Sequence, residues 1–219
     1  MTKGLDVMTK NHLALVAILL ASTLPPAMAA PAAAPATATA PALSQTEEAS
    51  RFAKQMLSDA TAALTKQGAT EAQKIAAFQE VLKKSLALDV VGRFMLGSTR
   101  DKMTAAQLAR YDAVFPQYIT RQYAQQFKDL VGRPMEVTEA RALNTRDSIV
   151  RAKIKRKDGA SINIDWRVRK LKDGSLKMID IIVSGVSIML VKREEFAAFI
   201  AKNGVDPLLA RLEKEAKGA

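Results

Sequence analysis

The chain has 219 residues, of which 48% are hydrophobic and 25% are charged, a composition typical of one globular domain with a sizeable core. It carries a net charge of +11, has no cysteine, and has a single histidine near the N-terminus, at His12. Beyond that position the sequence therefore excludes Ser-His-Asp and Cys-His nucleophiles, CxxC redox chemistry, and zinc sites built from His or Cys.

The first 29 residues have the pattern of a secretory signal peptide. Basic residues precede an apolar run over 13–24 that is short for a membrane span, and residues 27–29 have the small-x-small pattern of a cleavage site. An uncleaved membrane anchor is the alternative, and Met8 would begin a more compact signal than Met1 does. Cleavage removes two of the 33 basic and one of the 22 acidic side chains and leaves a net charge of +10. We therefore expect an exported protein.

Residues 30–43 are rich in Ala, Pro and Thr, and this composition predicts a disordered linker. A single folded domain is expected over 44–219, beginning with a capping box formed by Ser44 and Glu47. Apolar residues at helical spacing then predict helices over about 44–67, 70–87, 88–96 and 104–130. Pro116 lies inside the last of these and predicts a kink or break near Val114.

From Met135 onward the apolar period changes from 3.6 to 2, which indicates strands. Four strands are predicted, over about 135–142, 147–156, 160–170 and 175–184. The turns between them are short enough for hairpins, so the sheet should be antiparallel. Two helices follow, the last one with Asp206 as N-cap and Pro207 at its first position. The predicted class is α+β: N-terminal helices packed on a four-stranded antiparallel curved sheet, closed by two C-terminal helices.

The fourth strand is apolar on both faces, so protein or a ligand must cover both. The candidate lipid-binding side chains lie on the central strands, just after them, and on the helix over 104–130: Tyr123, Phe127, Ile164, Trp166, Met178, Ile182 and Val186. Aromatic, Met and aliphatic side chains form the adaptable lining that a pocket for hydrocarbon needs. The predicted slot lies between strands 160–184 and the helix bearing Tyr123. The alternative is that each of these residues belongs to an ordinary core.

Basic side chains alternate along the strands: Lys153, Lys155, Arg167, Arg169 and Lys177. They indicate a solvated face, or else a surface for anionic lipid head groups or an acidic partner, and export argues against nucleic acid. Asp165 and Asp180 are the candidates for acid–base catalysis, against the alternative of a salt bridge with Arg167 or a neighbour. Because no His or Cys accompanies them, the prediction is a protein that is not an enzyme and has no cofactor and no metal.

Five motifs resemble the periplasmic MlaC/toluene-tolerance family in order and spacing: VGRFMLG at 91–97, YITRQY at 118–123, DWR at 165–167, DIIVSGVS at 180–187 and NGVD at 203–206. The resemblance covers about 44–215. It implies a phospholipid carrier of a Gram-negative periplasm, which serves outer-membrane lipid asymmetry as an auxiliary component of an inner-membrane ABC transporter. The family's lipid pocket carries over onto Tyr123, Val186 and Phe127.

The implied partners are a two-chain phospholipid, the substrate-binding component of the ABC transporter, and an outer-membrane lipoprotein complex. A hopanoid-linked, HpnM-like branch has the same fold and similar motifs, so a hopanoid or another apolar lipid is the alternative cargo. The alternative from a different class is a secreted basic interaction module that binds no lipid.

Overall fold

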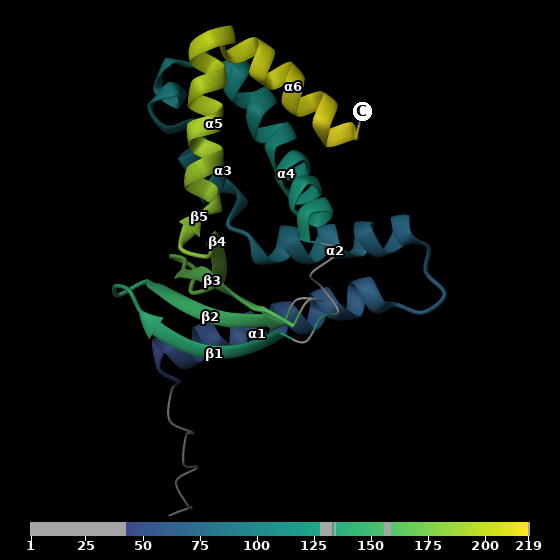
Figure 1. Cartoon of the computed structure of the whole chain (residues 1–219). Helices are drawn as coiled ribbons and strands as arrows, with labels where there is room; N and C mark the ends of the chain where they lie inside the picture. Colours follow the sequence, from purple (N-terminus) through teal and green to yellow (C-terminus); the bar gives the residue numbers. More distant parts are fainter. Residues whose placement is uncertain (1–42, 128–132, 134, 156–158, 219) are drawn as a thin grey trace, which may run out of the picture. The chain divides into compact units, whose positions relative to one another are not determined.

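Helices precede and follow the sheet in a computed structural model of the chain (Figure 1), which describes residues 43–127, 133, 135–155 and 159–218. The helices are α1 (Gln45–Thr65), α2 (Glu71–Ser85), α3 (Leu88–Leu96), the 3₁₀ helix η1 (Gly97–Lys102), α4 (Ala105–Phe127), α5 (Ile188–Asn203) and α6 (Val205–Lys217). The predicted signal peptide over 1–29, and the predicted linker over 30–43 except Leu43, lie outside the described residues. Within the described ranges, no helix is both long enough and apolar enough to cross a membrane.

The sheet is antiparallel and its strands follow chain order: β1 (Met135–Ala142), β2 (Asp147–Lys155), β3 (Ser161–Lys170), β4 (Leu176–Val183) and β5 (Val186–Ser187). The first four are the predicted strands. The two-residue β5 was not predicted, because two residues carry no periodicity. Ser184 and Gly185 form the tight turn before β5. Their φ angles of 50° and 85° are both positive, as a type I′ hairpin turn requires. The predicted α+β class is confirmed.

Helices α1 and α2 cover one face of the sheet. In Figure 1, α1 lies along β1 and β2, and α2 lies beside α1 and reaches β4. The most deeply buried α1 side chains are short apart from one methionine: Ala49, Ala53, Met56 and Ala60, with the larger Phe52, Leu57 and Leu64 partly buried beside them. Alternate strand residues are buried beneath the two helices, among them Val150, Ala152, Ile154, Ile164, Trp166, Val168, Met178 and Ile181. The period-2 pattern of the strands thus gives the sheet one apolar face for the helical cover.

Helix α4 is continuous across Pro116, so of the predicted kink or break near Val114 the break is wrong, and the kink stays a prediction. A proline in a helix removes only its own N–H and the bond to the carbonyl four residues earlier. The hydroxyl of Thr120 donates to the Pro116 carbonyl oxygen at 2.7 Å. Contacts with α2, α3 and α6 hold the helix in place on several sides.

The start of α6 also differs from the prediction. Its N-cap is Gly204, and Asp206 and Pro207 lie within the first turn. Proline is tolerated there because the first N–H groups of a helix have no intrahelical partner. The Asp206 carboxylate accepts hydrogen bonds from Gln107 and Arg110 of α4, at 3.1 and 3.4 Å. The side chain predicted to cap α6 therefore joins it to α4.

Gly92 sets how closely α3 approaches α4. A Cβ atom at this position would lie 3.1 Å from the Phe115 ring, and the hydroxyl of Tyr111 donates to the Gly92 carbonyl oxygen at 3.0 Å.

We expect Gly92→Val to lower the free energy of unfolding by about 2 kcal/mol, because overpacking forces the ring or the helix to move. Urea unfolding measures this. Ala197→Val, on the exposed side of α5, is the control and should cost only a few tenths of a kcal/mol; equal losses would contradict the prediction.

Candidate functional site

An almost wholly apolar cavity of about 60 Å³ lies between α1, α2 and the sheet. Eleven apolar side chains line it: Met56, Leu57 and Ala60 of α1, Phe78 and Leu82 of α2, Met135 of β1, Ile154 of β2, Ile164 and Trp166 of β3, and Met178 and Ile181 of β4. The side chain of Ala60 is too short to fill the space above the strands. Three of the side chains that line the cavity are methionines: Met56, Met135 and Met178. Methionine adapts its shape readily, so this lining can repack around hydrocarbon.

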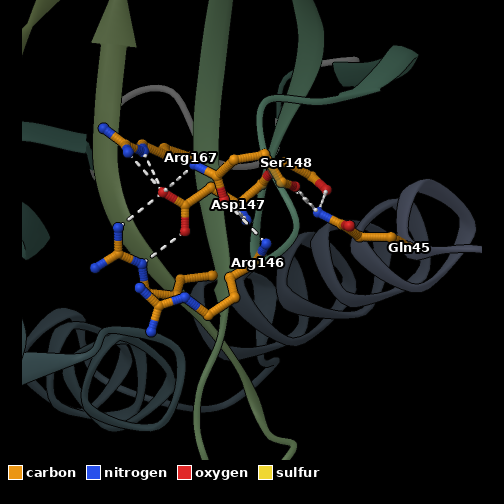
Figure 2. A network of polar contacts seen from close by, with 7 residues as sticks. Gln45, Arg146, Asp147, Ser148 and Arg167 are labelled. Carbon is orange, nitrogen blue, oxygen red and sulfur yellow. Dashed lines mark hydrogen bonds and ion pairs between the residues drawn. The ribbon is translucent and has the colours of Figure 1, made fainter.

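Polar contacts fix the N-terminal end of α1 to the turn between β1 and β2 (Figure 2). The side-chain amide of Gln45 donates to the backbone carbonyls of Asn144 and Asp147, at 2.9 and 3.1 Å, and to the hydroxyl of Ser148 at 3.1 Å. Lys170 of β3 adds an ion pair to the α1 residue Glu48, at 2.8 Å. One end of the helical cover is therefore held to the sheet.

The centre of this network is the carboxylate of Asp147, whose side chain is 1% exposed. It accepts from Arg169 at 2.6 and 2.7 Å and from Arg167 at 2.5 and 3.0 Å, as the dashed lines of Figure 2 show for the two guanidinium groups. The hydrogen bond from Arg169, followed by the bonds and charge of Arg167, holds the pKa of the Asp147 carboxyl well below its usual range, although burial acts in the opposite direction. The carboxylate therefore stays charged at neutral pH.

The C-terminal end of α2 is fixed to β4. Leu86 forms a parallel bridge with Met178, and the N–H of Ala87 donates to the Met178 carbonyl at 3.0 Å. The ammonium of Lys177 donates to the backbone carbonyl of Lys84. The turn between α1 and α2, around Gly68, is exposed and has no such tie to the sheet among the described residues. The cover is thus held at its two ends.

The predicted site residues fall into two groups. Ile164, Trp166 and Met178 line the cavity. Tyr123 lies elsewhere: it is fully buried, and its hydroxyl donates to the sulfur of Met189 in α5 at 3.3 Å. Burial raises the pKa of Tyr123 well above its usual value, and nearby Asp180 adds to the shift. The cavity is therefore covered by α1 and α2, whereas the prediction placed the slot against the helix bearing Tyr123.

The other predicted residues do not line the cavity either. Ile182 is half-buried and directly follows Ile181, so it lies on the opposite face of β4. Val186 in β5 is 52% exposed. Phe127 is the last residue of α4, and its side chain lies outside the described part of the structure. For all seven residues, lipid binding stays a prediction.

The sequence predictions missed eight of the eleven lining residues, those of α1, α2, β1 and β2 together with Ile181. A signal was present in α1, where Ala53, Met56 and Ala60 form a stripe of small and flexible side chains. Such a stripe shows that a helix face is buried, but it does not show against which element.

Asp165 and Asp180, the candidates for acid–base catalysis, and three of the predicted basic residues form structural contacts with other described residues. The carboxylate of Asp165 forms a bidentate ion pair with Arg151 of β2, at 2.7 and 2.8 Å. The predicted salt bridge of Asp165 is therefore present, with Arg151 as its partner instead of Arg167. Asp180 accepts from the Ser187 hydroxyl at 2.7 Å and from the N–H of Met189 at 3.3 Å, and thereby supports the start of α5. Of the predicted basic face, Lys153 and Lys155 are exposed, whereas the two arginines bind Asp147 and Lys177 binds α2.

Comparisons with known proteins agree on one family. The family model for MlaC protein matches residues 50–214. The intermembrane phospholipid transport system binding protein MlaC of Haemophilus influenzae is 23% identical over 133 residues, which are 59% of this chain and 62% of that protein, less than two thirds of its length. The solved structure of the phospholipid-binding protein from Ralstonia solanacearum, in complex with a phospholipid, has a TM-score of 0.65 at 22% identity. That match covers 77% of this chain and 97% of the other, and it shows the fold.

The buried carboxylate predicts a pH-dependent stability. Asp147→Asn keeps the shape but removes the charge between two arginines, and we expect it to lower the free energy of unfolding by about 2 kcal/mol at pH 7. Because the pKa of Asp147 is lower in the folded than in the unfolded chain, its contribution is complete above about pH 5 and is lost as the pH falls below about 4.

Urea unfolding at several pH values tests this. The difference between the natural protein and Asp147→Asn should shrink as the pH decreases. Asp101→Asn is the control, because Asp101 is exposed on η1 and makes no ion pair among the described residues. A difference that stays constant from neutral to acidic pH would show that Asp147 does not act through its charge.

Proposed function

The chain belongs to the MlaC family, as its motifs predicted, and on this premise we propose that it is a periplasmic phospholipid carrier. The related Haemophilus protein is the binding protein of an intermembrane phospholipid transport system, and the related Ralstonia protein was solved with a phospholipid. Membership of this family of transport proteins confirms the prediction that the chain is not an enzyme. In the proposed pathway, lipid moves between the outer membrane and an inner-membrane ABC transporter.

The observation that carries the proposal is the apolar cavity under α1 and α2. A two-chain lipid exposes about 30 methylenes, and at about 0.8 kcal/mol each its aqueous monomer lies about 24 kcal/mol above the bilayer. Free diffusion across an aqueous compartment is therefore negligible, and a protein that covers the acyl chains removes this barrier. The eleven apolar side chains offer such a cover.

The cavity must widen to hold acyl chains. Its volume of about 60 Å³ is below the ~150 Å³ that holds one benzene molecule in an engineered protein cavity. The two tied ends of the α1–α2 pair, near Gln45 and Leu86, leave the middle of the pair and its exposed turn as the part that can move away from the sheet. We therefore infer that the middle of the α1–α2 pair moves away from the sheet when the carrier takes up lipid.

Location and partners complete the proposal. The predicted signal peptide over 1–29 supports export, and the family supports a periplasmic protein. The proposed protein partners are the substrate-binding component of the transporter and an outer-membrane lipoprotein complex. A partner that binds the open form more tightly than the closed form would couple docking to release, since it shifts the equilibrium by its differential affinity.

Lipid extraction tests the proposal directly. The protein, purified after export, is extracted with organic solvent, and the extract is analysed by mass spectrometry. We expect stoichiometric two-chain phospholipid. Extracts that contain a hopanoid would support the alternative cargo, whereas protein that is reproducibly empty and also takes no lipid from vesicles would leave the basic interaction module as the better account.

A cavity-filling substitution tests the location of the slot. Ala60 is 4% exposed, and a leucine there adds three carbon atoms beside the cavity. We expect Ala60→Leu to lower bound lipid several-fold, while the free energy of unfolding of the empty protein changes by less than about 1.5 kcal/mol. Ala76→Leu, on the exposed side of α2, should leave both quantities unchanged. Full lipid loading of Ala60→Leu would place the slot elsewhere.

A further inference from the structure

A groove of about 720 Å³, lined by both polar and apolar side chains, runs along the outer side of α1, beside the edge strand β1. Two of its lining residues, Leu57 of α1 and Met135 of β1, also line the apolar cavity. Both are only partly buried. They therefore lie between the cavity and the groove, where α1 contacts β1.

The lining changes at Leu57 and Met135 from the apolar side chains of the cavity to the partly polar side chains of the groove. Lys54, Ser58 and Thr61 follow one another at intervals of four and three residues, so they form one polar stripe on α1. This stripe lies about 140° around the helix from the buried stripe that carries Met56 and Ala60, with Leu57 between the two.

The groove offers positive charge and hydroxyl groups together. Lys54 is exposed and forms no ion pair within the described part of the chain, and it also lines a second groove that continues along α1 to Arg51. The hydroxyls of Ser58 and Thr61 make no hydrogen bond among the described residues. Arg133 adds a second cation to the groove, against one carboxylate from Glu136.

We propose that this groove holds the anionic head group of the bound phospholipid, with the phosphate beside Lys54 and the acyl chains passing between Leu57 and Met135. The inference rests on the proposed carrier function and extends it to the choice of cargo. A fixed ammonium at the mouth of an apolar cavity favours a head group of net negative charge over a zwitterionic one. The polar stripe and the apolar stripe of one helix then bind the two ends of one amphipathic ligand.

The test is a competition between two lipids with identical acyl chains. The exported protein is incubated with vesicles of equal parts phosphatidylglycerol and phosphatidylcholine, separated from them, and extracted for mass spectrometry. We expect the protein to prefer phosphatidylglycerol about fivefold, and Lys54→Gln to abolish most of this preference by lowering the amount of bound phosphatidylglycerol. Lys202→Gln, at an exposed lysine of α5, is the matched control and should keep the preference.

The outcomes separate the two proposals. Protein that takes neither lipid overturns the carrier function and this inference with it. Protein that takes lipid in the same ratio with and without Lys54, or that loses its preference equally in Lys202→Gln, remains a carrier but does not hold the head group in this groove.

A second measurement locates the head group without relying on charge. Because the chain has no cysteine, Thr61→Cys gives a single attachment point for a fluorophore, with Ala201→Cys on the exposed side of α5 as control. A phosphatidylcholine that carries a nitroxide on its choline group should quench the probe at position 61 strongly and the probe at position 201 weakly. Equal quenching at both positions would overturn the proposed location.

Discussion

The rest of the structure depends on how the apolar face of the sheet is kept from water. Strand alternation places Ile154, Trp166 and their neighbours on one face, and no strand of the sheet can cover them. Helices α1 and α2 provide the cover, but the alanines of α1 are too short to fill the space above the larger strand residues. The polar ties lie at the two ends of the cover, where Gln45, Asp147 and Leu86 are. Between these ties, the described side chains that line the cavity are apolar and make non-directional contacts, which can be exchanged for contacts with hydrocarbon at little cost.

Much of the fold could be predicted because its signals are local. The capping boxes at Ser44 and Thr70 mark helix starts, and alternation with short turns places four strands to within about a residue. The candidate site could not be predicted as well, because its lining depends on which helix meets which face. The aromatic residue Tyr123 has the periodicity of a buried position whether it faces a cavity or, as here, Met189. The ion pair of Asp147 could be predicted only in part, because it depends on the strand register that places Asp147 opposite Arg169.

The proposed carrier has to keep its apolar lining from water whenever it holds no lipid. A permanently open slot of lipid size would expose apolar surface to water, with a cost that grows with the area exposed. Here the lining residues Met56, Met135 and Met178 come from three different elements and pack so closely that a cavity of only about 60 Å³ remains. This packing resembles an ordinary core, so the shape of the molecule alone distinguishes it only weakly from a module that binds no lipid.

The contact between α1 and the sheet also bears on how the chain folds. Each hairpin of the sheet closes a short loop, whereas Gln45 and Asn144 are 99 residues apart in sequence, and Glu48 and Lys170 are 122 apart. Bringing such distant segments together costs more chain entropy than forming a hairpin, so α1 is expected to dock onto a sheet that has already formed. The reverse step, in which α1 leaves an intact sheet, is then among the least costly partial unfolding events of the native protein. The movement proposed to admit a lipid, in which the middle of the α1–α2 pair lifts while its tied ends stay in place, is a partial form of this step.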